Sequence, residues 1–296
     1  MNEPFQAQSF NASGGQWTPP SGTIANQMLS KRSALKMREA KQSKVALARR
    51  IEEASLNAWP AIQQIFLDGW VLRFSRGFTK RSNSIVPLYP PMQSTHSLLQ
   101  KIRYCENLYA REQLQTVFRL TSINEPAQDL SAIHGTLDQV LQNRDYRLDE
   151  TSLVLTASIT DTSTNEIELL ALDRWLDVYC ELTGMTDPAR SLHRLILRSI
   201  QGECAFATLR KGNEPVAIGL AVVEQELVGL FDVYTADHHR GRGYAKSLVT
   251  DLLNWASRTG AQRAYLQMVN ANEPAAALYT ALGFEEIYRY WYRIAG

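Results

Sequence analysis

In the C-terminal half of the chain, the spacing of apolar residues alternates between the period of a strand and that of a helix. Three runs between residues 203 and 235 are short, mostly apolar and separated by polar turn residues, as buried strands are. The stretches at 244–256 and 273–282 have apolar residues at helical spacing, and each is followed by another strand-like run. With a short strand and two helices before them, residues 161–296 predict the order β-α-α-β-β-β-α-β-α-β. Helices placed among strands in this way are typical of an α/β or α+β domain.

The two helices that precede these strands have recognisable ends. Gly184 is expected to terminate the first, because glycine readily adopts the left-handed conformation that ends many helices. Asp187 and Pro188 are expected to supply the N-cap and first residue of the second. The residues expected on its apolar side are Leu192, Leu195, Ile196 and Ser199.

The N-terminal half has a less regular pattern, for which we predict the order β-β-α-β-α-β. Ser94 or Thr95 is expected to cap its first helix, because a hydroxyl at that position accepts from a free N–H of the first turn. An earlier helix from Leu47 should end at Trp59-Pro60, since the residue before proline disfavours helix. The expected elements are strands at 69–75 and 82–89, a helix at about 98–109, a strand near 116–122, a helix at about 126–141 and a strand at 152–160.

The first 44 residues differ from the rest. Residues 1–30 are polar and rich in Gly and Pro without apolar periodicity, which indicates disorder. Residues 31–50 carry eight Lys or Arg and one acid, Glu39, and two interpretations stay open: a basic arm for RNA or a ribosomal surface, or a solvated approach to the first helix. We therefore divide the chain into a disordered, basic tail (1–44), an N-terminal domain (45–160) and a C-terminal domain (161–296).

Composition narrows the class of protein. The 31 Lys and Arg balance 30 Asp and Glu, so no overall field favours nucleic acid or an anionic membrane as a partner. Cys105, Cys180 and Cys204 show no metal-ligand spacing, so we predict reduced thiols and no metal. The apolar run at 216–223 is too short to span a bilayer, and the N-terminus lacks the pattern of a secretory signal. These features predict a cytoplasmic protein.

The most informative segment, HHRGRGYAKSLVTDLL, joins the last of the three strands to the helix that follows it. Gly241 and Gly243 permit positive φ and let the backbone approach a ligand closely, while the first turn of a helix offers free N–H donors and a partial positive charge. Arg240 and Arg242 add full charges. The segment is neither a P-loop nor a dinucleotide fingerprint, but it predicts a cradle for a pyrophosphate.

Arg240-Gly241-Arg242-Gly243-Tyr244-Ala245 resembles the [QR]-x-x-G-x-[GA] signature of the GNAT superfamily of acyl-CoA-dependent N-acyltransferases. NANEPAAALYTALGF, at 270–284, is similar to the motif that follows in that superfamily. The resemblance covers roughly residues 150–296. It implies the GNAT fold with a mixed central sheet, acetyl-CoA as co-substrate, no metal, and transfer of an acetyl group to a primary amine by direct attack in a ternary complex.

The resemblance also implies roles for individual residues. The backbone of Val233, Tyr234 and Thr235 would hold the acyl-pantetheine arm, and residues 240–245 would hold the pyrophosphate. Asn272 would contact the cofactor, although it is also a plausible helix N-cap. Tyr279 matches the general acid that protonates the CoA sulfur, with ordinary helix packing as the alternative. Asp237 stands where the family often has proline, which leaves the local backbone less fixed.

The general base is open. Asp232 is the one acid inside the strand 227–235 and is our candidate, with Glu224 and Glu226 just before it. A carboxylate with an ordinary pKa is a weak base for an ammonium group, so burial or a relay would be required. His238 and His239 flank the pyrophosphate turn and are expected on the phosphate side or in solvent.

The N-terminal order β-β-α-β-α-β looks like the latter part of the same fold without the signature, so we infer a smaller, degenerate GNAT-like half. Residues 59–84 are similar to the start of bacterial two-part GNAT proteins.

Two functions remain: an active N-acetyltransferase, or a non-catalytic protein that binds or senses acyl-CoA. The acceptor would be a small-molecule amine or a peptide or protein amine; nucleic acid and membrane are not expected as partners, and a homodimer is compatible. Two groups of side chains are candidates for contact with the acceptor. Arg76, Lys80 and Arg81 either meet an acidic acceptor or the cofactor, or they are solvated on a loop. The aromatic residues of the terminal strand either line a groove or pack in the sheet; they are Tyr288, Tyr290, Trp291 and Tyr292.

Overall fold

The computed structural model describes residues 22–89, 97–123, 137–160 and 166–296, with side chains from residue 36 onward. The chain divides into two units, residues 1–43 and 44–296. Helix α1 (Gly22–Ala58) begins well before the predicted start at Leu47, so part of the predicted disordered tail is helical. This segment has no proline and no glycine after Gly22, and nothing in it interrupts a helix. Residues 1–21 lie outside the described part of the chain.

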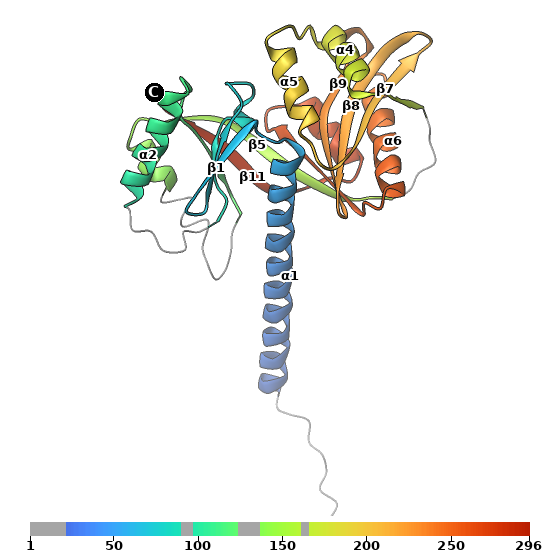
Figure 1. Ribbon diagram of the computed structural model, residues 1–296. Helices are drawn as coiled ribbons and strands as arrows, with labels where there is room; N and C mark the ends of the chain where they lie inside the picture. Colours follow the sequence, from blue (N-terminus) through green and yellow to red (C-terminus); the bar gives the residue numbers. More distant parts are fainter. Residues whose placement is uncertain (1–21, 90–96, 124–136, 161–165) are drawn as a thin grey trace, which may run out of the picture. The chain divides into compact units, whose positions relative to one another are not determined.

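Within residues 44–296 the described strands form one continuous mixed sheet (Figure 1), in the order β1-β2-β3-β4-β11-β5-β10-β9-β8-β7-β6. Neighbouring strands are antiparallel except for β3 with β4 and β9 with β10, which are parallel. The strands are β1 (Gln63–Leu67), β2 (Trp70–Phe74), β3 (Ile85–Pro87), β4 (Val117–Thr121), β5 (Arg147–Ser158), β6 (Ile167–Leu169), β7 (Glu203–Lys211), β8 (Glu214–Glu224), β9 (Leu227–Thr235), β10 (Arg263–Val269) and β11 (Glu285–Ile294).

The two halves have the same topology and exchange a strand. In the first half, β1, β2, β3, α2 (Leu98–Arg111), β4, a helical segment at 137–142 and β5 follow one another. The second half repeats this order as β7, β8, β9, α6 (Tyr244–Arg258), β10, α7 (Glu273–Ala281) and β11. Strand β5 lies between β10 and β11, and β11 lies between β4 and β5, so each half contains the last strand of the other. The predicted GNAT-like character of the N-terminal half is therefore visible in its topology, and the two halves share one sheet.

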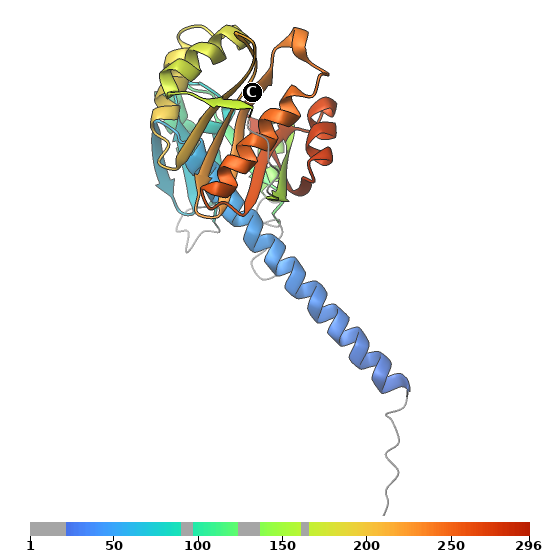
Figure 2. The same ribbon diagram turned by 90° about the vertical axis from the view of Figure 1, so that its right-hand side faces the viewer.

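Alternate side chains of β8 show how the two faces of the sheet are covered. Ile218, Leu220 and Val222 belong to a core with α4 (Leu172–Thr183) and α5 (Ala189–Arg198). Ala217 and Ala221 point to the opposite face, where α6 packs. This alternation follows from the two-residue period of a strand. Figure 2 shows α6, in orange, crossing its face of the sheet.

The predicted helices α2, α4 and α5 are present, and the structure corrects details of how they begin. Gly184 ends α4 in the left-handed conformation, as predicted. Helix α5 begins one residue later than predicted, with Pro188 at the N-cap position, while the Asp187 carboxylate accepts hydrogen bonds from the Ser191 backbone N–H and hydroxyl. Ser97 caps α2 in a capping box; the predicted caps at 94 and 95 lie outside the described residues. No helix in the described part of the chain combines the length and apolar character needed to cross a bilayer.

Strand β1 is an addition to the predicted elements, and the fully buried residues of α5 include only Ile196 of the four expected on its apolar side. The side chains of β1 are largely exposed, so the strand lacks the alternation of apolar and polar residues that would identify it. In α5 the buried residues are His193, Ile196 and Leu197, whereas Leu195 is exposed. His193 therefore lies on the buried face of α5, where the apolar spacing predicts leucine.

The three cysteines are free thiols, and burial raises the pKa of each. Cys105 is fully buried and its pKa rises to about 12; that of Cys204 rises to about 11. Because the thiolate is the reactive form, we expect Cys105 and Cys204 to react slowly with a thiol reagent at pH 8 in the native protein and rapidly in denaturant. Rapid labelling of Cys105 in native protein, read by peptide mass, would contradict this packing.

Candidate active site

Strands β9 and β10 separate at their C-terminal ends, which opens a gap in the sheet. Their parallel pairing runs from Leu227 with Arg263 to Leu230 with Leu266 and then stops. Beyond that point β9 remains paired with β8, up to Thr235 with Ala217. The edge of Asp232, Val233, Tyr234 and Thr235 that faces β10 is therefore not used in the sheet. Backbone groups on such an edge are available to an extended ligand.

Asp232 lies at the start of this gap, on an irregularity of β9. The register with β8 shifts between Ile218 and Leu220, and Asp232 has φ of 50°. A bulge of this kind re-aims a side chain, and such bulges occur often beside active sites. The carboxylate of Asp232, 15% exposed, lies 2.9 Å from Nε2 of His193. The predicted base therefore has a buried imidazole as its partner.

His193 is held in a cage of aromatic rings. Its ring centroid lies 5.4 Å from that of Trp59, 5.6 Å from Phe78 and 5.2 Å from Tyr179. His193 is 1% exposed, and its Nδ1 has no hydrogen-bond partner among the described residues. Because an ionised carboxylate can only accept hydrogen bonds, we assign Nε2–H of His193 as the donor to Asp232. Burial raises the pKa of Tyr179, and the nearby Asp232 carboxylate raises it further.

A cavity of about 350 Å³ opens beside Asp232. This volume is at the small end of the range for ligand pockets. It lies where β9 and β10 have separated, and residues from both halves of the chain line it. The lining residues are Trp59, Thr79, Lys80, Arg81, Glu150, Ser152, Asp232, Gln267, Met268, Val269, Tyr290 and Tyr292. Of the acceptor candidates predicted from the sequence, Lys80, Arg81, Tyr290 and Tyr292 meet here, whereas Arg76 is exposed. Glu224 and Glu226, which were considered with Asp232 for the general base, are not among the lining residues.

The predicted pyrophosphate turn has the conformation that a cradle requires. Gly241 and Gly243 have φ of 74° and 84°, and a Cβ at either position would meet no atom within 4 Å. Gly243 is the N-cap of α6 and provides no side-chain cap. The first N–H groups of α6 thus remain free to donate hydrogen bonds to an anion. Arg240 pairs with Asp237 at 2.7 Å, while Arg242 makes no ion pair with any described residue.

A second cavity, of about 550 Å³, begins at this turn. It runs along α6 at Lys246, Ser247 and Thr250 and reaches Ala281 and Leu282 at the end of α7. The acyl-CoA implied by the resemblance fits this arrangement, because open space, free amide donors and the cationic side chains of Arg242 and Lys246 occur together.

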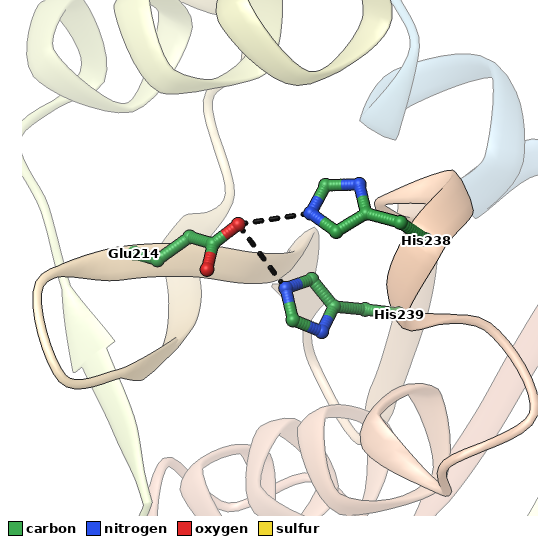
Figure 3. A group of neighbouring side chains, drawn as sticks. All are labelled: Glu214, His238 and His239. Atoms are coloured by element: carbon green, nitrogen blue, oxygen red, sulfur yellow. Dashed lines mark hydrogen bonds and ion pairs between the residues drawn. The ribbon is translucent and has the colours of Figure 1, made fainter.

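His238 and His239 lie just before the turn and share one carboxylate, that of Glu214 on β8 (Figure 3). Nε2 of His238 is 2.9 Å from Oε1 of Glu214, and Nε2 of His239 is 3.2 Å from the same oxygen. These bonds lower the pKa of Glu214. The three ligand atoms lie within 4.8 Å of one another, a donor set that transition metals accept. These contacts join the start of the turn to β8.

The two predicted residues of the following motif are on α7. Asn272 is the N-cap of this helix, and its side-chain oxygen accepts from the Ala275 N–H at 3.2 Å, so the capping interpretation is confirmed. Tyr279 is 7% exposed and packs edge-on against Phe284 with ring centroids 5.7 Å apart. Burial raises the pKa of Tyr279 to about 12, so its hydroxyl keeps its proton at any physiological pH.

Asp232 lies at the first cavity and the glycine turn at the second, with the free edge of β9 between them along the chain, and two residues of the site were not predicted. His193 was overlooked, although a histidine three and four positions before two buried apolar residues is a detectable signal. Trp59 was interpreted only as a helix end, yet it lines the cavity.

Comparisons with known proteins cover both halves of the chain. Residues 45–293 match the family model described as "Probable histone acetyltransferase Rv0428c C-terminal". Over 248 residues the chain is 25% identical to YobR of Bacillus subtilis, named an uncharacterized N-acetyltransferase, which covers 83% of this chain and 98% of that protein. Over 254 residues it is 28% identical to the probable histone acetyltransferase Rv0428c of Mycobacterium tuberculosis, covering 81% of this chain and 72% of that protein.

The fold is also similar to a solved structure. A GCN5-related N-acetyltransferase from Kribbella flavida superposes with a TM-score of 0.62 at 15% sequence identity, covering 84% of this chain and 95% of that one. At this identity the similarity concerns the fold. Because the match extends over most of both chains, the paired arrangement of two halves recurs in that protein.

Proposed function

Because the chain belongs to the family of the probable histone acetyltransferase Rv0428c C-terminal region and is an acetyltransferase of the GNAT type, we propose that it transfers an acetyl group from acetyl-CoA to a primary amine. The amine would be bound in the cavity beside Asp232, and the reaction would be a direct attack within a ternary complex. The observation that carries this proposal is the gap between β9 and β10, with the 350 Å³ cavity at Asp232 and the glycine turn just beyond the end of β9.

Acetyl-CoA would supply an acetyl group activated as a thioester. The N–H groups of residues 241–246 and the guanidinium of Arg242 would bind its pyrophosphate, and the cavity between α6 and α7 would accommodate part of the carrier. The free edge of Val233 to Thr235 would hold the extended arm by backbone hydrogen bonds. Arg240 contributes less charge than Arg242, because Asp237 already neutralises it.

Asp232 and His193 would act on the amine. Nucleophilic attack needs a neutral amine, so one proton must leave the ammonium group for the Asp232 carboxylate or a water bound to it. His193 donates to Asp232 and fixes its orientation, and the aromatic cage restricts the imidazole. His193 is thus a positioning residue for the base.

Tyr279 would complete the proton balance. As the N–C bond forms, the C–S bond breaks and the departing thiolate needs one proton. A tyrosine whose pKa burial raises to about 12 remains protonated and can donate to a sulfur that becomes basic as it departs. Asp232 releases the first proton of the ammonium group to solvent before the attack, and the second proton leaves the nitrogen by the same route as the amide forms. The Tyr279 phenolate recovers a proton from solvent, so both residues return to their starting state and one proton is released per turnover.

We expect Gly243→Val to abolish or strongly weaken CoA binding, because the added side chain would occupy the open space above the first N–H groups of α6. The expected loss is about tenfold or more in Kd, which corresponds to one charge-assisted hydrogen bond of about 1.5–3 kcal/mol. Isothermal calorimetry with CoA on the folded protein provides the measurement.

Gly260→Val is the matched control for this experiment. Gly260 follows the other end of α6, also has positive φ, at 101°, and would likewise place a Cβ in open space. Both variants carry similar backbone strain and should lose similar stability. If Gly243→Val bound CoA as tightly as Gly260→Val, the proposed cradle would be wrong.

A further inference from the structure

Arg81 differs from the other charged residues that line the acceptor cavity. Lys80 pairs with Asp149 at 2.6 Å and with Glu150 at 2.5 Å, and these bonds raise its pKa against the effect of burial. The carboxylate of Asp232 is bonded to His193. Arg81 makes no ion pair with any described residue, and its buried Nε has no hydrogen-bond partner among them. The cavity therefore contains one cation without a counter-ion.

The environment of Arg81 explains why this charge is unusual. Its guanidinium carbon lies 5.6 Å from the ring centroid of Trp59 and 5.8 Å from that of Phe231. Aromatic faces stabilise a cation only partly, by about 0.5–2 kcal/mol. Arg81 is half-buried, and the Tyr290 side chain is hydrogen-bonded to it. A partly buried cation without a charged partner is unfavourable, so an anion bound there would stabilise it.

Other buried arginines behind the cavity increase the positive charge. Arg73 and Arg119 are essentially inaccessible, and Glu52 is the buried carboxylate that pairs with Arg119. The guanidinium of Arg73 is bonded to backbone carbonyls, including that of Arg81 at 2.8 Å, and burial together with its arginine neighbours lowers its pKa to about 9. Although burial raises the pKa of Tyr290, the charges of Arg81 and Arg119 lower it below its ordinary value. Among Arg73, Arg81, Arg119 and Glu52, positive charge thus exceeds negative charge, whereas the charged residues that line the cavity are balanced, with Lys80 and Arg81 against Glu150 and Asp232.

We propose that the acceptor is a small amine that also carries a carboxylate, such as a free amino acid, with the carboxylate on Arg81 and the amine at Asp232. The inference rests on the proposed function, because it specifies the acceptor of that same site. A guanidinium binds a planar carboxylate through two parallel hydrogen bonds, which makes arginine well suited to this recognition. A cavity of about 350 Å³ fits a molecule of this size, and Trp59, Met268 and Tyr290 provide apolar surface for its side chain.

The experiment compares acceptors that differ only in the carboxylate. Free amino acids, their carboxamides and the corresponding decarboxylated amines are offered to the full-length protein with acetyl-CoA, and release of free CoA is measured. We expect the acids to have a kcat/KM about 10- to 150-fold above that of their carboxamides, the range for a lost charge-assisted hydrogen bond. Arg81→Gln should remove this preference by raising KM for the acids to about that for the amides.

Arg76→Gln is the matched control, since it removes the same charge from the same loop at an exposed position that does not line the cavity. It should keep the preference for acids. Circular dichroism and CoA binding confirm that each variant is folded. Binding of the acids to CoA-saturated protein, measured by calorimetry, gives a second readout that needs no turnover.

The outcomes separate this inference from the proposed function. If acids and amides are acetylated equally well, or if a peptide lysine without a free carboxylate is preferred, the acceptor assignment is wrong while the acetyltransferase proposal stands. If no amine is acetylated but the acids bind in an Arg81-dependent way, the assignment of Arg81 stands and the proposed reaction is wrong. Equal binding of acids by wild type and Arg81→Gln overturns the inference directly.

Discussion

Replacing Glu52 with alanine is expected to lower the free energy of unfolding by about 3–5 kcal/mol, the usual cost of leaving one member of a buried ion pair without its partner. Glu52 is 2% exposed and Arg119 is 1% exposed, so solvent does not screen their interaction. Nη1 and Nη2 of Arg119 both contact the carboxylate, with Nη2 at 3.2 Å from Oε2, and the Tyr288 hydroxyl donates to it as well. Without Glu52, the neighbouring buried arginines would have no carboxylate among them.

Urea denaturation followed by circular dichroism measures this effect. Glu226→Ala is the control, because Glu226 pairs with Arg50 on the same helix α1 but at an exposed position. Its transition should lie close to that of wild type. Glu52→Met combined with Arg119→Met should recover much of the lost stability, since an apolar pair of similar volume can replace a buried ion pair. Equal transitions for Glu52→Ala and Glu226→Ala would show that the buried pair contributes little.

Tyr279→Phe is expected to lower kcat by about 100-fold or more, within the range attributed to a positioned general acid. The substitution removes one hydroxyl and keeps the ring that packs on Phe284, so the fold and CoA binding should be unchanged. Because the pKa of Tyr279 is about 12, ionisation of this group should not reduce the wild-type rate below about pH 10. Steady-state kinetics with the best acceptor and calorimetry with CoA separate the two effects.

Tyr104→Phe is the control for Tyr279→Phe, since Tyr104 is half-exposed on α2 and far from the proposed machinery in sequence and fold. It should leave kcat unchanged. If Tyr279→Phe and Tyr104→Phe had the same kcat, the role of Tyr279 would be limited to packing in the core beneath α7, and another proton donor would have to be sought.

Much of the second half could be predicted from local signals. The order of its strands and helices follows from apolar spacing, and Gly184, Gly241 and Gly243 mark helix ends where positive φ is required. Asn272 could be predicted as the N-cap of α7 from its residue type alone. These are properties of short segments, for which neighbouring residues in the sequence are also neighbours in space.

The features that depend on distant contacts could not be predicted. The sequence of β5 does not indicate that this strand pairs with β10 and β11, which lie more than a hundred residues further along the chain. The meeting of Arg81 and Asp232 at one cavity depends on that pairing, because they come from different halves. The partnership of His193 with Asp232 likewise requires α5 to lie over β9. Sequence reasoning named Arg81 and Asp232 separately but had no way to place them together.

The exchange of β5 and β11 also has a consequence for biosynthesis. Strand β4 acquires its second neighbour only when residues 285–294 have left the ribosome, after the other strands that the structure describes have been made. Until then the first half presents an open edge, a surface that recruits other chains. Chains truncated before residue 285 should therefore aggregate more readily than the full-length chain.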